Sequence, residues 1–503
     1  MLSSTTAIKR LGRFAVGLSL VLAASARAEP LDLTGCVRLA LAHNPDIQDS
    51  ADSAVSAVLG RDVPLAEYHF KLVPSVSGGL QGGNNTNQQY QGELSRKLLL
   101  TGTEIGVKGG TSVYSSVPQT SVPYLTEARF TLSQPLWQGR SRLENSDRID
   151  DADRRIAAAK HALESAREDL MLQVTHGFYD VVRAEELVRV ATLSLDRVSQ
   201  LDQIARAKLG IGAVSKMDVF RTELHATRLK NALVEQQARR EAAVDQLRGL
   251  VGLPPDVPLE IDTRVLGVTT GGADPAHEAS RGSSAKPVDL APPPGERVEE
   301  TVEDALGRRP ELAEAREQVA DAERKALLAH YKIWPAVNLV GSYAQIGTGN
   351  NFEESSHLGR TEWLVGVSST TPLDRTEERV TAAQAEITLR GRERRYRAMR
   401  DQVIRQVRDA WRQLERARAE RTLAAEIVEQ TEKQTELARF RYEKGVTDNF
   451  DLVQAETELA EARSGQVLAA IDEVLNAAQL RRVAETLGEA FAIADGSHDG
   501  AGN

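Results

Sequence analysis

The sequence predicts an α+β protein in which very long α-helices and antiparallel β-strands occur in two similar halves of the chain. Three observations carry this prediction: one phrase occurs twice, the segments beside it lack proline, and short segments elsewhere alternate apolar and polar residues. Only 4% of the 503 residues are aromatic, which suits long helices better than a thick globular core. The net charge of −10 gives no basic surface of the kind that nucleic acid requires, so we expect no nucleic-acid partner.

The repeated phrase surrounds a glycine turn. ARAKLGIGAVSKMDVFRTELHATRL is similar to ARFRYEKGVTDNFDLVQAETELAEA, and their alignment places Gly212 opposite Gly445. An earlier pair, CVRLALAHNPDI and TVEDALGRRPEL, aligns Pro45 with Pro310. Because the two repeated stretches occur in the same order, the sequence predicts an internal duplication.

Each half is expected to contain a helix, strands, a very long helix, a glycine turn and a shorter helix. A segment rich in glycine, proline and serine separates the halves and is interpreted as an exposed linker. The predicted order is a signal peptide at 1–28, a first repeat at 29–261, a linker at 262–297, a second repeat at 298–488 and a flexible tail at 489–503. The first repeat is expected to contain a helix, strands at about 73–136, a long helix at 141–208 and a helix at 216–251. The second is expected to contain a helix, strands at about 335–372, a long helix at 375–443 and a helix at 449–487.

The first residues have the pattern of a secretory signal peptide. Positive charges precede a short apolar run, Phe14–Ala24, and the small-residue cleavage site Ala26-Arg27-Ala28 follows it. The run is too short to span a bilayer, which takes about 20 apolar residues in a helix. We therefore expect the mature chain to be exported.

The single cysteine, Cys36, excludes an internal disulfide. The segment LTGC that contains it resembles a lipoprotein cleavage box, so lipidation of Cys36 is one interpretation. The other interpretation places Cys36 within the first helix, because Glu29 and Asp32 separate it from the apolar run.

The long helices contain the spacing of a coiled-coil seam. No proline occurs between Leu136 and Leu253 or after Pro372, and each long helix would extend roughly 100 Å at 1.5 Å per residue. The glycine phrases end these helices, with Ser215 and Asn449 as candidate N-caps of the next ones. Steps of four and three join the seam residues Val403, Val407, Ala410, Leu414 and Ala417.

The strand segments alternate in the way of a barrel that has one lipid face and one wet face. An ordinary half-exposed sheet has the same pattern over one segment and is the alternative interpretation. Residues 88–114 could add a further hairpin, which would either enlarge the barrel or project outside it. The alternating apolar residues are Ala128, Phe130 and Leu132 in the first half and Trp363, Val365 and Val367 in the second; the candidate interface aromatics are Tyr124, Trp137, Tyr343 and Trp363.

These motifs together resemble the TolC-like outer-membrane efflux protein family. LTGCVRLALAHNPDI is similar to the first-helix signature of the family, LSQPLWQG to its strand-to-helix signature, and the two glycine tips to its internal repeat. The resemblance covers about Leu33 to Leu487. It implies a homotrimer in the outer membrane, in which a long α-helical coiled-coil barrel in the periplasm is continued by a transmembrane antiparallel β-barrel. Four strands per chain would then give twelve strands, and open sheet edges in lipid independently favour oligomerisation.

The resemblance also implies a gate at the hairpin tips. Asp451 would face the lumen and form an acidic ring that binds cations, with Asp448 compensating for Gln454, which stands where a second acid is expected. Tyr442 and Asp218 match members of a polar lock, whereas Met217 and Thr447 replace two of its partners. Asp218 has an alternative role as a helix-start acid. The gate residues are then Asp451, Asp448, Asp218, Tyr442 and Thr447, and the tip residues available to a periplasmic adaptor are Lys208, Leu209, Gly210, Gly212, Gly445 and Val446.

The predicted function is a passive exit duct for substrates that an inner-membrane transporter delivers through a periplasmic adaptor protein. The sequence contains no Walker-type loop and no HExxH or paired-cysteine spacing, so we expect neither catalysis, cofactor nor metal site. A periplasmic adaptor and a soluble coiled-coil scaffold are the alternatives. The residues do not indicate the cargo.

Overall fold

The computed structural model describes residues 31–81, 85–115, 123–212, 214–261, 297–447 and 449–491. The predicted signal peptide, almost all of the predicted linker, Asp448 and the tail from residue 492 lie outside the described residues. None of the helices in the described part of the chain is both long and apolar enough to cross a lipid bilayer.

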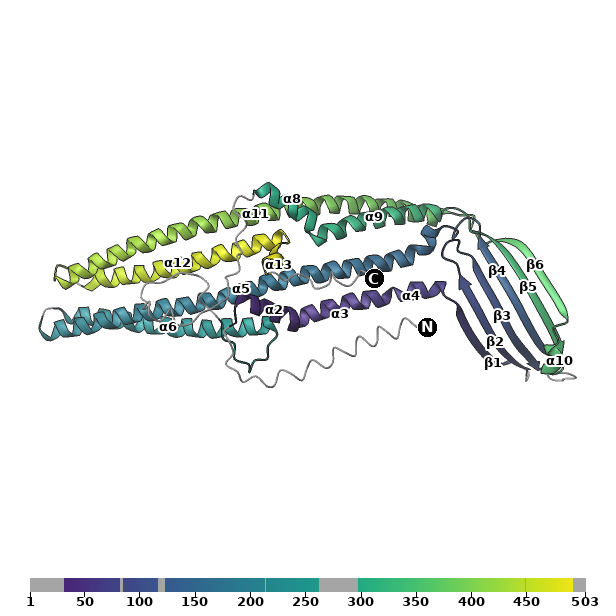
Figure 1. Ribbon diagram of the computed structural model, residues 1–503, viewed down its shortest axis with the longest axis horizontal. Helices are drawn as coiled ribbons and strands as arrows, with labels where there is room; N and C mark the ends of the chain where they lie inside the picture. Colours follow the sequence, from purple (N-terminus) through teal and green to yellow (C-terminus); the bar gives the residue numbers. More distant parts are fainter. Residues whose placement is uncertain are drawn as a thin grey trace, which may run out of the picture. The chain divides into compact units, whose positions relative to one another are not determined.

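Long helices and antiparallel strands follow one another along the chain, and Figure 1 labels them. The first half contains α2 (Leu33–His43), α3 (Pro45–Gly60), α4 (Asp62–Leu65), η2 (Ala66–Tyr68), β1 (Lys71–Gln81), β2 (Asn85–Lys97), β3 (Glu104–Ser115), β4 (Tyr124–Pro135), α5 (Arg142–Gly210) and α6 (Lys216–Val251). The second half contains α8 (Val298–Arg308), α9 (Pro310–Tyr331), β5 (Val337–Gly349), α10 (Phe352–Ser356), β6 (Arg360–Ser369), α11 (Thr376–Glu443), α12 (Asn449–Val483) and α13 (Leu487–Ala490).

The chain forms two compact units, and each draws on both predicted repeats. The helical unit comprises 1–44, 168–296 and 409–503, and the sheet unit comprises 45–167 and 297–408. The division falls within the long helices α5 and α11, so neither repeat is a unit by itself.

In the helical unit, α2 packs on the end of α6. The Asp32 carboxylate accepts a hydrogen bond of 2.7 Å from the Gly35 amide and so caps α2. The Asn44 side chain donates to the Leu250 carbonyl at 3.0 Å. Gly252 ends α6 in the left-handed conformation, with a φ of 76°, which suits glycine because it has no Cβ.

The Cys36 thiol, on α2, has no exposed surface. Burial, with a further contribution from the Asp32 carboxylate, raises the pKa of Cys36 to about 12. The structure therefore matches the helix interpretation of Cys36, in which the side chain packs against its neighbours.

We expect the Cys36 thiol to be inert in the folded protein. A rise in pKa from 9.0 to about 12 lowers the thiolate fraction about a thousandfold, and burial excludes the reagent as well. A kinetic assay with a chromogenic disulfide should show rapid reaction of one thiol only after denaturation. Rapid reaction of the folded protein, or a lipid adduct on Cys36 in the intact mass, would contradict the burial.

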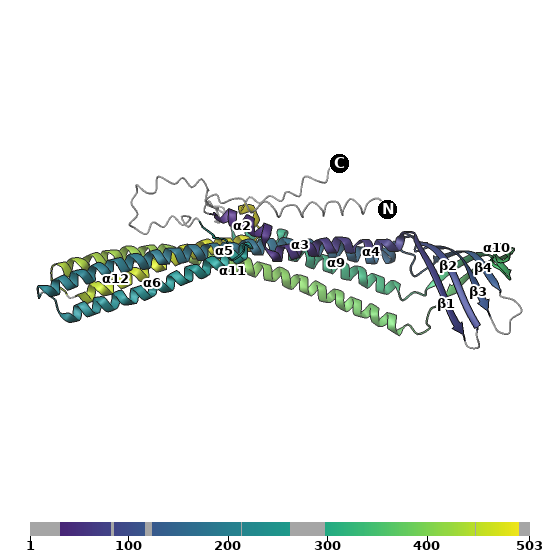
Figure 2. The same ribbon diagram turned by 90° about the horizontal axis from the view of Figure 1, so that it is seen from below.

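Small and β-branched side chains let the helices of this unit approach closely. A Cβ on Gly177 of α5 would lie 3.0 Å from Leu250 Cδ1, so only glycine fits there without a shift. Figures 1 and 2 show α5 beside α6 and α11 beside α12, as two hairpins. The residues predicted for the seam of the second long helix, which runs through both units, are all buried: Val403 and Val407 in the sheet unit, and Ala410, Leu414 and Ala417 in the helical unit.

In the sheet unit, a network of ion pairs joins α5 to α9. The Arg324 guanidinium contacts Asp321 at 2.9 Å, Asp151 at 3.3 Å and Asp150 at 3.7 Å, and it also pairs with Asp147. The Arg324 side chain is only 13% exposed, so these charges are shielded from solvent on one side. Arginine suits this place because its planar fork can donate to several carboxylates at once.

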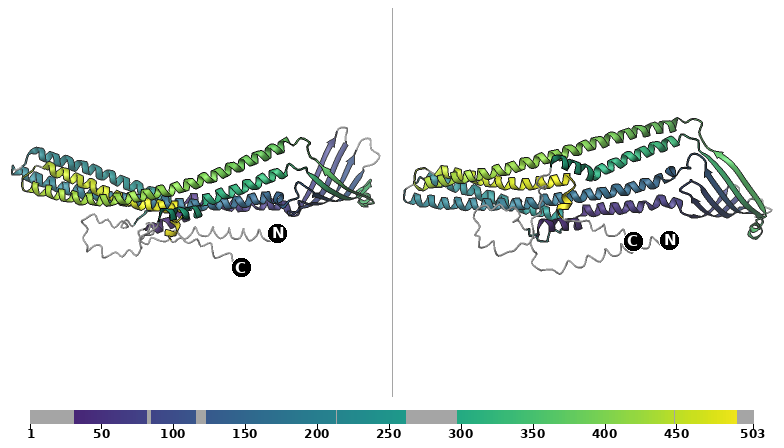
Figure 3. Two further views of the ribbon diagram at one scale, coloured as in Figure 1. Left: turned by 90° about the horizontal axis from the view of Figure 1, so that it is seen from above. Right: turned by 45° about the horizontal axis from the view of Figure 1, so that its top comes forward.

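The strands of this unit form one antiparallel sheet in the order β1-β2-β3-β4-β5-β6. Figures 1 and 3 show the six strands as a single curved layer. The family resemblance implies four transmembrane strands per chain, whereas the sheet of this chain contains six strands. The two additional strands come from the segment predicted as a possible further hairpin, residues 88–114. Its strands, β2 and β3, pair with each other and also with β1 and β4.

Candidate functional site

The two hairpin ends of the helical unit are built on glycines in the left-handed conformation. Gly212 and Gly445 each have a φ of 73°, which few other residues adopt without strain. The Gly212 amide donates to the Leu209 carbonyl at 2.9 Å, and the Val446 amide donates to the Arg441 carbonyl at 3.0 Å. These bonds satisfy the last carbonyls of α5 and α11 and reverse the chain.

Ser215 and Asp218 form a capping box at the start of α6. The Asp218 carboxylate accepts from the Ser215 amide at 3.0 Å and from its hydroxyl at 2.8 Å, and the Ser215 hydroxyl accepts from the Asp218 amide at 3.3 Å. Ser215 is thus an N-cap, as predicted. Asp218 takes the helix-start role that was the alternative to its place in a lock.

One contact between the two hairpins joins Lys208 to Tyr442. The Lys208 ammonium donates to the Tyr442 carbonyl at 3.1 Å and lies 4.0 Å from the centre of the Tyr442 ring. A cation over an aromatic face adds electrostatic attraction to the hydrogen bond. The structure therefore brings together one predicted tip residue and one predicted gate residue.

A second contact depends on Asn449, which is completely buried. Its side-chain amide donates to the Asp218 carbonyl at 2.7 Å, and its oxygen accepts from Arg221 at 3.1 Å. The prediction of Asn449 as an N-cap is wrong, because α12 begins at Asn449 itself and the side chain crosses to α6. Only the three-dimensional arrangement reveals this bridge, since asparagine before a helix normally indicates a cap.

Two buried hydroxyls at the hairpin ends have no hydrogen-bond partner within the described residues: those of Tyr442 and Thr447. Burial raises the pKa of Tyr442, and the negative Asp218 raises it further. The Asp218 carboxylate accepts its hydrogen bonds from Ser215, and the Tyr442 hydroxyl does not donate to it within the described residues. Buried polar atoms normally have a hydrogen-bond partner, so we expect the partner of each of these hydroxyls to lie outside the single chain.

The Asp451 carboxylate is exposed in the first turn of α12 and forms no ion pair within the described residues. Gln454, which stands where a second acid is expected, donates to Glu458 at 2.9 Å. Asp448 lies outside the described residues. Asp451 is therefore the gate candidate whose charge is uncompensated in the described structure.

The remaining predicted tip residues surround exposed apolar side chains. Gly210, Gly212 and Gly445 are exposed, and Lys208 and Leu209 are partly buried. Val446 is 73% exposed, and Ile211, which the sequence analysis did not select, is 80% exposed. An apolar residue beside a turn glycine is the signal that would have identified Ile211 as well.

The strand register sorts the sheet into two different faces. One row of directly paired residues crosses all six strands and is wholly apolar: Leu72, Leu94, Val107, Phe130, Tyr343 and Trp363. Each of these side chains is at least 40% exposed. The adjacent row lies on the opposite face and carries four charges: Val73, Glu93, Lys108, Arg129, Ala344 and Glu362.

Exposed aromatic residues lie just outside the ends of three strands, on the side of the sheet where the strands join the helices. Phe70 precedes β1, Trp137 follows β4 and Trp334 precedes β5, with exposed fractions of 66%, 58% and 62%. The Arg96 guanidinium lies over the Phe70 ring at 4.8 Å. Aromatic and basic side chains at this level are typical of the boundary between a lipid interior and water.

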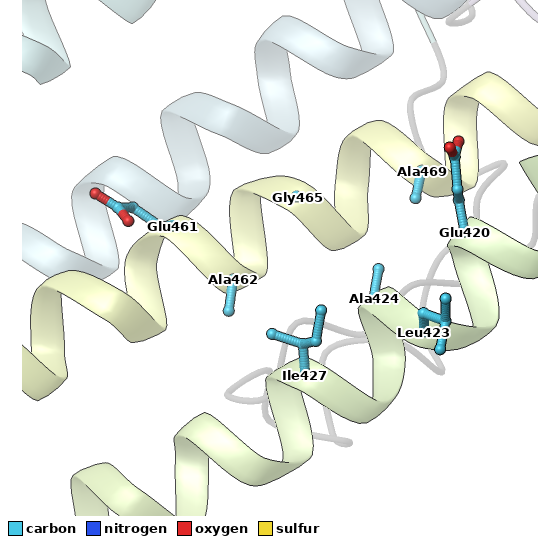
Figure 4. A pocket seen from close by; sticks show the side chains of 8 residues that line it. All are labelled: Glu420, Leu423, Ala424, Ile427, Glu461, Ala462, Gly465 and Ala469. Atoms are coloured by element: carbon cyan, nitrogen blue, oxygen red, sulfur yellow. The ribbon is translucent and has the colours of Figure 1, made fainter.

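The helices α11 and α12 also enclose an apolar groove of about 410 Å³. Figure 4 shows Leu423 and Ile427 of α11 facing the small residues of α12. The α12 side of the groove is lined by Ala462, Gly465 and Ala469. No cluster of three metal-ligating side chains occurs within the ranges that the structure describes.

Comparison with known proteins supports the resemblance that the motifs indicate. A family model described as outer membrane efflux protein matches residues 301–484. Over this segment the chain is similar to that family. The TolC-like resemblance inferred from the motifs is thus confirmed.

The names of two relatives of this chain mention different substances. The cobalt-zinc-cadmium resistance protein CzcC of Cupriavidus metallidurans is 23% identical over 322 residues, which are 64% of this chain and 68% of the relative. The toxin and drug export protein A of Aggregatibacter actinomycetemcomitans is 23% identical over 229 residues, or 46% of this chain and 42% of the relative.

Solved structures share the fold over nearly the whole chain. The open state of the MtrE outer-membrane channel of Neisseria gonorrhoeae matches 90% of this chain and 89% of its own, with a TM-score of 0.65 and 17% identity. The CmeC outer-membrane channel of Campylobacter jejuni matches 90% of this chain and 86% of its own, with a TM-score of 0.63 and 14% identity. At such identities the likeness shows the fold alone.

Proposed function

We propose that three copies of this outer-membrane efflux protein assemble into one passive exit duct. The sheets would close into a transmembrane β-barrel whose apolar face meets outer-membrane lipid, and the long helices would form a coiled-coil barrel in the periplasm. The observation that carries this proposal is the apolar row across all six strands, backed by a charged row on the other face. A sheet with one apolar and one charged face, and with open edges, suits a wall between lipid and a wet lumen.

The hairpin ends are proposed as the gate. Around a threefold axis, the exposed and unpaired Asp451 would occur three times, and Asp448 would add a second set of acids. Like charges that converge on a narrow opening repel one another and attract cations. The buried hydroxyls of Tyr442 and Thr447 would find their hydrogen-bond partners on a neighbouring copy.

The exposed apolar residues at the hairpin ends, Ile211 and Val446, are proposed to contact the periplasmic adaptor that links the duct to an inner-membrane transporter. Cargo selection would then belong to the transporter, which agrees with the different cargoes named for the relatives of this fold. No catalytic step is proposed, and energy would come from the transporter.

The gate proposal predicts that Asp451→Ala changes the ion selectivity of the channel. Loss of three converging charges should lower the cation-to-anion permeability ratio about twofold or more and weaken block by divalent cations. Single-channel recording in planar bilayers measures both. Glu241→Ala, which removes an exposed acid from the middle of α6, is the control. Unchanged selectivity and block in the Asp451 variant would contradict the acidic ring.

The contact of Lys208 with Tyr442 is expected to hold the two hairpins together in the closed state. Lys208→Met removes both the hydrogen bond and the cation from the ring, so channels should open more often and the mean conductance should rise. Lys216→Met removes an exposed lysine of the same hairpin end and should leave the conductance unchanged. Equal effects of the two variants would show that only the lost charge matters.

A further inference from the structure

The β2–β3 hairpin, residues 85–115, is a structural part of the sheet. The ladder between β1 and β2 runs from Lys71↔Ser95 to Gln81↔Asn85, and the ladder between β3 and β4 runs from Glu104↔Ser133 to Val113↔Tyr124. The two strands are 13 and 12 residues long, which equals the lengths of β5 and β4. A projecting hairpin would pair only with itself, so the observed pairing places this one between β1 and β4.

The hairpin also has the same two faces as its neighbours. Leu94 and Val107 continue the apolar row between Leu72 and Phe130, and they are 40% and 48% exposed. On the opposite face, Glu93 pairs with Lys108 within the charged row. A shift of one residue in the pairing of two strands would move the apolar side chains of one strand to the opposite face. The apolar residues of all four strands lie on the same face, so this register separates an apolar side from a polar side.

The outer edges of the sheet, at β1 and β6, have no partner strand within the described residues. Unpaired backbone groups are strongly unfavourable in lipid, so both edges need another strand there. All neighbouring strands are antiparallel, which means that the first and last of six strands run in opposite directions. The β6 edge of one chain can therefore continue the antiparallel pattern onto the β1 edge of the next.

We propose that the membrane wall of this protein contains six strands from each chain and closes by pairing of β6 with β1 of a second copy. This inference rests on the trimer proposed above, in which three copies would give eighteen strands rather than the twelve implied by the family resemblance. Because the diameter of a barrel grows about linearly with strand number, the wall would be roughly 1.5 times wider than a twelve-stranded one. The membrane exit would then be wide enough to hold an open aqueous lumen.

Adjacent cysteines on β2 test whether the hairpin lies in the wall. Gln89→Cys places a thiol on the charged face and Tyr90→Cys places one on the apolar face, while the buried native Cys36 should stay silent. In lipid nanodiscs, a charged water-soluble thiol reagent should react with Cys at 89 at least about tenfold faster than at 90, because a thiolate forms poorly in lipid.

The matched variants Arg129→Cys and Phe130→Cys on β4 provide the reference. β4 lies in the membrane wall whether each chain contributes four strands or six. The same asymmetry at 89 and 90 as at 129 and 130 supports the six-stranded wall. Equal rates at 89 and 90 with asymmetry at 129 and 130 would overturn the inference and leave the proposed duct intact. Equal rates at both pairs would overturn the duct as well.

Crosslinking tests the closure between chains. Ser77 of β1 and Leu364 of β6 lie near the middle of the two edge strands on the charged face, so the variant Ser77→Cys with Leu364→Cys should give covalent trimers with a flexible bis-maleimide. Each single variant lacks one edge thiol and should remain monomeric on denaturing gels. Absence of crosslinked chains from a protein that is trimeric by mass would show that β1 and β6 do not meet.

Discussion

Replacing Arg324 by methionine should destabilise the sheet unit by roughly 2–4 kcal/mol, because Arg324 is the cation shared by four aspartates of α5 and α9. Methionine keeps the aliphatic volume, but Arg154 and Lys325 then remain as partners for only two of the four carboxylates, those of Asp151 and Asp321. Thermal unfolding followed by far-ultraviolet circular dichroism should show a lower midpoint. Arg316→Met, which removes an exposed arginine from the same helix, is the control and should have little effect.

The penalty of Arg324→Met should also depend on pH. Burial alone would raise the pKa values of Asp151 and Asp321, but hydrogen bonds and attraction from neighbouring Arg and Lys side chains outweigh burial and lower both from 3.8. A lowered pKa means that these aspartates stabilise the folded state above about pH 4 and lose that contribution as the pH falls through the folded value. The difference between wild type and variant should therefore be largest near neutrality and shrink in acid. A difference that stays constant down to pH 3 would contradict an electrostatic origin.

Gly252→Ala should detach α2 from α6 at a cost of roughly 2–4 kcal/mol. Alanine is strained at a φ of 76°, and its Cβ would lie 2.8 Å from the His43 carbonyl oxygen and 2.9 Å from its carbon, which are backbone atoms that cannot move aside alone. The Cys36 thiol reports on this detachment, because it is a buried residue of α2, the helix that the contact holds in place. Its rate of reaction with a thiol reagent should rise by at least about tenfold in the variant.

Gly249→Ala is the matched control three residues earlier in α6. Its Cβ would meet nothing within 4 Å, so the helix should gain up to about 1 kcal/mol and Cys36 should stay unreactive. If Gly252→Ala also leaves Cys36 unreactive and the unfolding midpoint unchanged, then the close approach of His43 to Gly252 does not hold α2 in place.

Much of the fold is predictable from local patterns in this sequence. Turn glycines at Gly212 and Gly445, the missing prolines of the long helices and the seam of α11 all correspond to features of the structure, because each depends on a few neighbouring residues. The number of strands was harder to predict. In β2, NTNQQYQGELSRK, only Tyr90 and Leu94 are large and apolar, so alternation alone could not place the hairpin inside the sheet.

The contacts at the candidate gate could not be predicted from local sequence patterns. Asp451 and Tyr442 are selected from the family resemblance, but the contacts that join the hairpins are not predicted by it. The side chain of Asn449 crosses to Asp218, and Lys208 lies over Tyr442, only because two helices far apart in sequence come together. Such contacts depend on tertiary packing, which no local pattern encodes.

The most direct test of the proposed duct is an electron cryo-microscopy reconstruction of the protein extracted from outer membranes and held in lipid nanodiscs. We expect a threefold particle in which the sheets of three chains close into one barrel, with eighteen strands and with Trp363 and Phe130 facing lipid. A monomer whose sheet stays open, or one whose apolar row is covered by protein rather than lipid, would contradict the central claim.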